Sequence, residues 1–310
     1  MPLMRSFFIA LSRSPLAKAV ITRTPGIRGS TRRFVAGETV EEALAAIRDL
    51  NAAACLATLD PLGENTASEA EARAAASEAL KALEGIQRDG LKANVSIKLT
   101  QMGLDLGDGM CESITASLLE KAKSLGTFVR IDMEGSAYTE RTVRIFEKLR
   151  ARYDNVGIVL QAYLRRTEAD IRWIASKGYN VRLCKGAYLE PESVAFQDMA
   201  EVNRNYLACA GILLSPQSLA AGTRPCFATH DPAMIAGVKE AAQRDAASRD
   251  RFEMQMLYGI RRDLQLELVK DGFTMRVYVP YGPQWYPYFM RRLAERPANV
   301  GFILRNMFKG

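Results

Sequence analysis

The 310-residue sequence contains a single histidine, His230, and its five cysteines form no Cys-x-x-Cys pair. Zinc sites built on several histidines are therefore excluded. The odd number of cysteines is typical of a reducing compartment and argues against a disulfide framework. Long apolar runs are also missing, because no stretch approaches the roughly 20 consecutive apolar residues of a membrane-spanning helix. We therefore expect a soluble, cytoplasmic globular protein.

Acidic residues are absent from residues 1–33, which hold seven of the 42 basic residues. The net charge of +7 is 42 minus 35, so the rest of the chain balances at 35 against 35. A nucleic-acid-binding body would carry its own basic patch, so this distribution argues against nucleic acid as a partner. The spacing of apolar residues predicts a basic amphipathic helix in this arm. Packing on the body or a second subunit, peripheral contact with the inner membrane surface, and a cleavable transit segment all remain open.

Beyond the arm, short β-branched runs alternate with longer amphipathic segments. Thr39 is a candidate N-cap for a helix with Val40, Ala43, Leu44 and Ile47 on its apolar face. Eight strand-like runs follow, within residues 53–64, 93–100, 127–135, 156–163, 180–188, 224–231, 251–258 and 274–282. Eight strand–helix units in about 250 residues predict an α/β fold of the (βα)₈ TIM-barrel type. No complete GxGxxG or GxxxxGK[ST] motif supports a doubly wound alternative. We divide the chain into an N-terminal basic arm with helices (1–50) and a barrel domain (51–310).

The ends of the predicted strands are rich in polar residues, and this is where barrel enzymes place their chemistry. Lys98 alternates with Val95 and Ile97, which predicts that it faces the barrel interior. A buried lysine needs a carboxylate, an anionic ligand or a lowered pKa, and Asp132 is a candidate partner. Asp132 and Glu134 share one face, so a Mg²⁺ site is the alternative for that pair.

Two further segments are dense in recognition chemistry. Arg182, Lys185 and Gly186 suggest an anionic or electron-rich ligand, with the glycine allowing close approach of the backbone. In the last helix, four polar residues at i, i+3, i+4 and i+7 share one stripe: Tyr288, Arg291, Arg292 and Glu295. Paired arginines beside a tyrosine form a clamp for a small carboxylate, although a solvated helix face is the simpler interpretation. His230 follows a strand, where it either contacts a ligand or is a buried, hydrogen-bonded histidine.

Together these residues suit a small anionic, partly apolar ligand such as an amino acid. No activated nucleophile is evident, so an organic cofactor is the natural inference. Two other classes of function remain open. One is a barrel aldolase or lyase that uses Lys98 or Lys185 as a Schiff base, or Asp132 and Glu134 on a metal. The other is a non-catalytic barrel that binds amino acids or a partner.

Ten motifs resemble the monofunctional bacterial proline dehydrogenases and keep their order along the chain. They are RFVAGET, LDPLGE, VSIKLTQMGL, RIDMEGS, VLQAYLRR, VRLCKGAYLE, FATHD, EMQMLYGI, RVYVPYG and YFMRRLAER. The resemblance covers the chain from about residue 33 onward. It implies a distorted barrel that holds non-covalent FAD, oxidises L-proline to Δ¹-pyrroline-5-carboxylate and passes electrons to a membrane quinone. It also implies that the last helix lies over the top of the barrel, and it leaves homo-oligomerisation open.

The resemblance also implies roles for individual residues. Lys98, Arg291 and Arg292 would bind the proline carboxylate, with Glu295 near them and Asp132 supporting Tyr278. The walls around the proline ring would be Tyr188, Leu257, Tyr278 and Tyr288. The FAD-binding positions would be Gln161, Arg182, Lys185, Gly186, Ala187, Thr229 and His230, with Arg182 near the reactive flavin nitrogen. Two positions depart from the family pattern: Asp231 stands where many members have Asn, and Leu189 stands where the bifunctional relatives have Trp.

Overall fold

The computed structural model describes residues 32–295, except for the side chains of Arg291, Leu293, Ala294 and Glu295. Eight parallel strands close into a barrel in sequence order. They are β1 (Leu56–Pro61), β2 (Ala93–Ile97), β3 (Val129–Ile131), β4 (Val156–Gln161), β5 (Asn180–Cys184), β6 (Arg224–Ala228), β7 (Glu253–Leu257) and β8 (Met275–Tyr281). The pairing of β1 with β8 closes the barrel, for example at Thr58 opposite Tyr278. The predicted TIM-type fold is confirmed.

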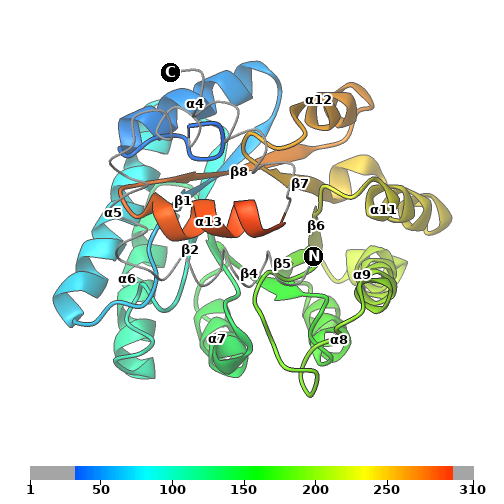
Figure 1. Cartoon of the computed structure of the whole chain (residues 1–310), viewed down its shortest axis with the longest axis horizontal. Coiled ribbons are helices and arrows are strands. Elements are labelled where there is room, and N and C mark those ends of the chain that lie inside the picture. The colour runs from blue at the N-terminus through cyan, green and yellow to red at the C-terminus, as the bar shows by residue number, and fades with distance from the viewer. Residues whose placement is uncertain (1–31, 296–310) are drawn as a thin grey trace.

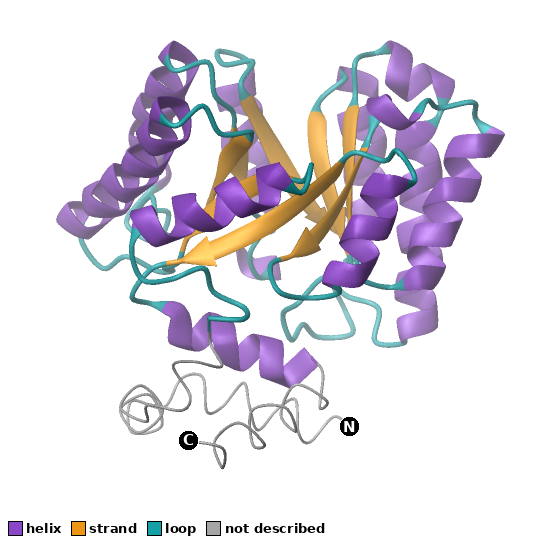
Figure 2. Cartoon of the chain, turned by 90° about the horizontal axis from the view of Figure 1, so that it is seen from above, coloured by secondary structure: helices purple, strands orange, loops and turns teal. Residues whose placement is uncertain are grey.

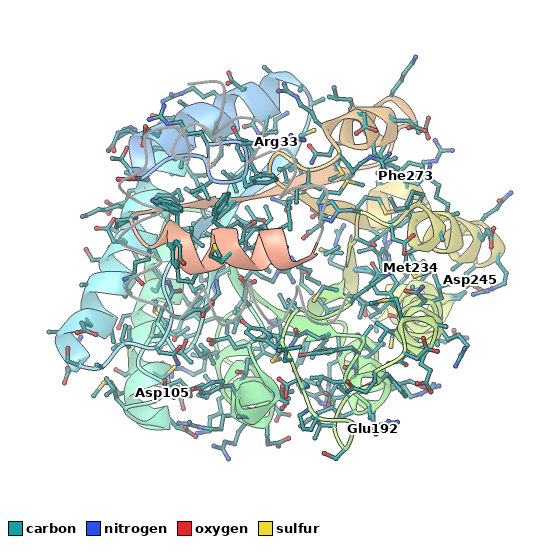
Figure 3. The ribbon with its side chains drawn as sticks, viewed as in Figure 1. Arg33, Asp105, Glu192, Met234, Asp245 and Phe273 are labelled. Atoms are coloured by element: carbon teal, nitrogen blue, oxygen red, sulfur yellow. The ribbon has the colours of Figure 1, made fainter. Side chains whose placement is uncertain are left out.

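Helices connect the strands and form the outer layer of the barrel (Figure 1). They are α5 (Glu69–Arg88), α6 (Asp108–Ser124), α7 (Ser136–Arg150), α8 (Thr167–Lys177), α9 (Met199–Leu214), α10 (Pro216–Ala220), α11 (Pro232–Arg244) and α12 (Arg262–Lys270), with the short 3₁₀ helix η1 (Arg249–Arg251) before β7. Charged side chains such as Asp105 and Glu192 project from the rim of the molecule (Figure 3). Every predicted strand window contains one strand, and each window is longer than its strand because the windows include the polar residues that follow.

The last helix, α13 (Trp285–Glu295), does not join the outer layer. Figure 1 shows it lying across the mouth of the barrel, and in Figure 2 the strand arrowheads point toward the covered end. Its aromatic residues Trp285 and Phe289 pack with Phe34 and Val35 in a small apolar cluster. A parallel barrel exposes the carboxyl ends of its strands here, so α13 lies over the end where active sites of this fold occur.

Helix α4 (Val40–Ala52) occupies the place in the outer layer beside β1 and β8. Its buried face, with Ala43, Leu44 and Ile47, belongs to the main core and covers apolar strand surface that α13 leaves open. The expected N-cap is confirmed, because Thr39 and Glu42 form a reciprocal capping box. Helix α4 is therefore part of the barrel's shell, and the division of the chain at residue 51 remains a prediction.

Candidate active site

A cluster of buried charges lies at the carboxyl ends of β1, β2 and β3. The Lys98 ammonium lies 3.2 Å from Oδ1 of Asp60 and 3.8 Å from Oδ2 of Asp132. All three residues are at most 8% exposed. Lys98 thus faces the barrel interior, as the alternation in its strand predicts. Its nearer partner is Asp60, whereas sequence reasoning suggested Asp132.

Charge balance keeps Lys98 protonated. Burial alone lowers the pKa of its ammonium, but the carboxylates of Asp60 and Asp132 outweigh burial and raise it above the ordinary value. A lysine that forms a Schiff base must lose its proton to become a nucleophile. The structure therefore gives no support to the lyase alternative at Lys98.

Asp132 is the centre of a second set of contacts. Its Oδ1 accepts from Nη1 of Arg182 at 2.9 Å and from Ser96 at 3.1 Å, and its Oδ2 accepts from the Tyr278 hydroxyl at 2.6 Å. The Arg182 guanidinium carbon also lies 5.1 Å from the centre of the Tyr278 ring. Burial, followed by the Asp132 carboxylate, raises the pKa of Tyr278 well above its ordinary value, so its hydroxyl remains a donor.

Glu134 points to different partners from Asp132. Its carboxylate accepts from the backbone N–H of Thr100 at 3.2 Å and from the Thr100 hydroxyl at 2.6 Å. Within residues 32–295, no group of three or more His, Cys, Asp or Glu is arranged to hold a metal ion. The two carboxylates are engaged separately, and the Mg²⁺ hypothesis for this pair loses its geometric basis.

Arg182 lies deep in the barrel, where its planar fork is held on two sides. Nε donates to Oε1 of Gln255 at 2.7 Å, and Nη1 donates to Asp132 and Ser96. Nη2 is buried and has no hydrogen-bond partner among the described residues. An orphaned buried guanidinium nitrogen is costly, so this nitrogen is suited to an acceptor on a bound ligand.

The segment after β5 forms a second wall of the site. Lys185 donates to Oδ2 of Asp231 at 2.7 Å, and Asp231 also caps α11, as predicted. Gly186 has φ +118°, and a Cβ at this position would overlap the ring of Tyr163. Only glycine lets the chain pass so close to that ring, and Ala187 and Tyr188 follow directly. The departure at Asp231 thus adds an ion pair to Lys185.

The other predicted cofactor residues border the same strand ends. Gln161 is buried and donates to the carbonyl of Glu134 at 2.9 Å. Thr229 is buried, and its hydroxyl accepts the backbone N–H of Asp231. His230 accepts the backbone N–H of Leu257 on Nε2 at 2.9 Å, so a neutral ring carries its proton on Nδ1. The histidine therefore links the ends of β6 and β7.

Helix α13 brings its predicted residues toward this region. Tyr288 is buried, and the Arg292 guanidinium carbon lies 5.2 Å from the centre of its ring. The side chains of Arg291 and Glu295 lie outside the described residues. Two roles were missed by sequence reasoning: Asp60 as the partner of Lys98, and Gln255 as the partner of Arg182. Asp60 is the next-to-last residue of β1 and Gln255 is the middle residue of β7, and a polar side chain within a strand was their only signal.

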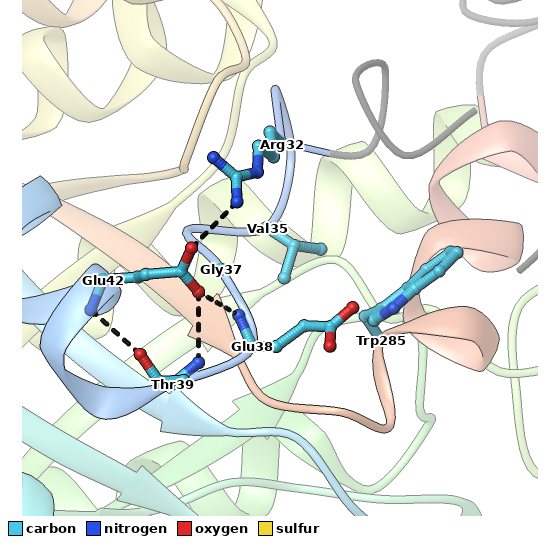
Figure 4. Close-up of a pocket in the computed structure, with 7 residues that line it drawn as sticks. All are labelled: Arg32, Val35, Gly37, Glu38, Thr39, Glu42 and Trp285. Atoms are coloured by element: carbon cyan, nitrogen blue, oxygen red, sulfur yellow. Dashed lines mark hydrogen bonds and ion pairs between the residues drawn. The ribbon is translucent and has the colours of Figure 1, made fainter. Parts of the chain in front are cut away.

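Two cavities lie away from this network. One, of about 290 Å³, lies between residues 32–42 and Trp285 (Figure 4), where the carboxylate of Glu42 is engaged by Arg32 and the backbone of Glu38 and Thr39. The other, of about 570 Å³, lies at the amino ends of the strands. Neither is lined by Lys98, Asp132 or Arg182, so the site is defined by its buried polar groups.

The five cysteines, all within the described residues, are free. Burial raises the pKa of Cys184 and Cys111 to about 12, and that of Cys226 to about 11. These thiols stay protonated at neutral pH, so thiolate nucleophiles play no part in the site.

Comparison with known proteins decides the family. The family model described as "Proline dehydrogenase" matches residues 43–305. The chain belongs to the proline dehydrogenase family. Proline dehydrogenase 1 of Bacillus subtilis is 40% identical over 307 residues, covering 99% of this chain and all of the relative. The proline dehydrogenase of Deinococcus radiodurans is 40% identical over 283 residues, covering 90% of each. This family comprises flavin-dependent oxidoreductases of proline catabolism, so the enzyme class and the substrate proline follow.

Solved structures agree with the fold. Proline utilization A (PutA) from Bdellovibrio bacteriovorus, inactivated by N-propargylglycine, superposes with a TM-score of 0.82 at 27% identity over 90% of this chain. This chain covers 34% of that protein, about a third of its length. Within residues 32–295, none of the helices is both long and apolar enough to cross a bilayer.

Replacing Lys98 with Met tests the buried charge cluster. The Asp60 carboxylate would lose its ammonium, and we expect the free energy of unfolding at pH 7 to fall by about 3–5 kcal/mol. Burial already raises the pKa of Asp60, while Lys98 lowers it and Asp132 raises it further. Removing Lys98 therefore raises that pKa, so the folded variant takes up a proton above the pH at which the unfolded chain does. The difference in the free energy of unfolding between the parent and Lys98→Met should therefore shrink as the pH falls through this range.

Urea unfolding at pH 7 and pH 5 measures the effect, with Lys98→Arg as the charge-conserving control. A deficit of the same size at both pH values would contradict the assignment of Asp60 as the charge partner.

Proposed function

We propose that this protein is an FAD-dependent dehydrogenase that oxidises L-proline to Δ¹-pyrroline-5-carboxylate. The observation that carries the cofactor part of the proposal is the buried Nη2 of Arg182, which has no partner among the described residues. A flavin presents ring nitrogens and carbonyl oxygens as acceptors along one edge, so its chemistry fits this donor. The close approach of the chain at Gly186 and the donor side chain of Lys185 fit the same group.

Proposed FAD contacts come from three neighbouring strand ends. Gln161, Arg182, Lys185, Gly186, Ala187, Thr229 and His230 would hold the cofactor. Bound FAD would supply the two-electron acceptor that the side chains lack. The role of Arg182 is to present positive charge to the flavin edge, which stabilises negative charge that accumulates on reduction.

The substrate would lie between the strand ends and α13. In this proposal Lys98, Arg291 and Arg292 bind the carboxylate of proline, because ammonium and guanidinium groups pair with a small carboxylate. The ring would be enclosed by Tyr188, Leu257, Tyr278 and Tyr288, with Glu295 near the clamp. Asp132 holds the hydroxyl of Tyr278, which fixes the orientation of that wall. The residues thus contribute positioning and the exclusion of water.

Anaerobic addition of L-proline to the purified protein tests this proposal. We expect a yellow protein whose visible flavin absorbance bleaches. The Arg291→Met variant should retain FAD and lose most of the proline-dependent bleaching, because the carboxylate clamp is incomplete. Arg244→Met, at an exposed position of α11, is the matched control. A colourless protein, or one that L-proline does not bleach, would overturn the proposal.

The pH dependence of turnover tests how proline reacts. The amine of proline must be neutral to give up hydride from the adjacent carbon, so kcat/KM should rise from neutral to alkaline pH. The pKa values of Lys98 and Tyr278 are both raised, so neither group loses its proton in this range. A flat profile, with substrate binding controlled, would contradict oxidation of the free amine.

A membrane quinone is the proposed electron acceptor, supported by the family resemblance. The basic arm, of which residues 1–31 lie outside the described residues, would contact the anionic inner membrane surface. Deleting residues 2–30 should reduce co-sedimentation with anionic liposomes and leave bleaching by L-proline unchanged. Equal sedimentation of the full-length and shortened chains would refute the membrane role of the arm.

A further inference from the structure

The direction of the Arg182 fork is fixed by two contacts. Nε donates to Gln255 at 2.7 Å, and Nη1 donates to Asp132 at 2.9 Å. A guanidinium is planar and rigid, so holding two of its nitrogens also fixes the direction of the third. Nη2 is that third nitrogen, and it is the one without a hydrogen-bond partner among the described residues. The contact from Gln255 therefore decides where Nη2 points.

The side-chain amide of Gln255 can do this in only one of its two orientations. Arg182 has donors alone, so Gln255 must turn its oxygen toward Nε and its NH₂ group the other way. The NH₂ group donates to Oε2 of Glu253 at 2.9 Å. Glu253 stands two residues earlier on β7, on the same face of the strand. An ionised carboxylate only accepts, so it excludes the flipped amide.

Glu253 is in turn held by Arg276 of β8. Nε and Nη2 of Arg276 donate to the two carboxylate oxygens at 2.7 and 2.8 Å, and Nη1 donates to the carbonyl of Ala57 at 2.7 Å. Burial alone raises the pKa of Glu253, but the bonds and charge of Arg276 outweigh burial and hold it at about 2. Glu253 is therefore ionised at any working pH and acts as an acceptor throughout.

We propose that Gln255 is a positioning residue for Arg182, and that Glu253, clamped by Arg276, fixes the orientation of the Gln255 amide. This chain of side chains, Arg276–Glu253–Gln255–Arg182, aims one guanidinium nitrogen at the flavin from inside the barrel. The inference rests on the proposed FAD-dependent function. It assigns a role in that function to Glu253 and Arg276, which lie toward the amino ends of the strands, away from the proposed ligand site.

Gln255→Leu removes the acceptor while keeping a branched side chain of comparable bulk. Arg182 would then be held through Nη1 alone, so its plane could rotate about that contact and Nη2 would be less well aimed at the flavin. We expect kcat to fall at least tenfold with the KM for proline within twofold, because the proposed carboxylate clamp is untouched. The midpoint potential of the bound FAD should fall, and the affinity of the apoprotein for FAD should weaken at least fivefold.

The exchanged pair Glu253→Gln with Gln255→Glu provides a rescue test. In this double variant the amide oxygen at 253 accepts from Nη2 of Arg276, and its NH₂ group donates to the carboxylate at 255, which accepts from Nε of Arg182. The bond between positions 253 and 255 reverses its direction, but the net charge and the acceptor for Nε of Arg182 are kept, and Nη2 of Arg276 still finds an acceptor at position 253. We expect kcat within fivefold of the parent and FAD affinity within twofold. This variant decides the question if Gln255→Leu does not fold.

Thr58→Val is the matched control, because Thr58 donates to Asn94 at 2.6 Å inside the same barrel and does not contribute to the contacts that hold Arg182. It should lower the urea midpoint and leave kcat and the flavin potential unchanged. If the parent protein binds no flavin, the proposed function fails and this inference with it. If the parent turns over proline, two results overturn the inference alone: Gln255→Leu with the parent's kcat and potential, or an exchanged pair no better than either single substitution.

Discussion

The pairing of buried charges inside the barrel is the constraint on which the rest of the site depends. A TIM-type barrel is ordinarily filled by layers of branched apolar side chains. Here the interior holds Lys98, Arg182 and Arg276, each beside a carboxylate. Removing charge from water is costly unless partners replace the lost hydration. Each carboxylate thus fixes the geometry of a cation, and the strands fix the carboxylates.

The paired charges are also held rigidly, because single carboxylates bind side chains from several strands. Asp132 serves Arg182, Ser96 and Tyr278 at once, so three strands converge on one carboxylate. A side chain held by several bonds has little freedom to adapt to a ligand, and preorganisation of this kind favours catalysis over loose binding. The buried Nη2 of Arg182, which has no hydrogen-bond partner within residues 32–295, is therefore the nitrogen available to a ligand.

The position of α13 is the second decisive feature. In a regular barrel the helix after β8 would cover β8 and β1, but α4 does so in this protein. The aromatic residues of α13 instead pack against the segment that precedes α4, which holds the helix across the mouth. Because α4 takes the place of the last helix in the outer layer, α13 is left to enclose the proposed substrate site.

Several elements of this design could be predicted from the sequence. The eight strands, the Thr39 cap, the Asp231 cap and the inward orientation of Lys98 depend on local spacing and local hydrogen bonds. The family resemblance added the placement of the last helix, which no local pattern indicates. The sequence did not reveal which residue pairs with each buried cation. Asp60 is 38 residues from Lys98 and Gln255 is 73 residues from Arg182, so local spacing carries no information about these contacts.

By itself, the sequence determined the alternation of strands and helices, the polar character of the strand ends and the confinement of excess charge to residues 1–33. These follow from residue order and from short-range periodicity. Only the tertiary structure decided which carboxylate neutralises which cation, and which guanidinium nitrogen remains for a ligand. Closing the barrel brings together side chains from β1, β2, β3, β5, β7 and β8, and such contacts depend on the register between strands, which no single strand encodes.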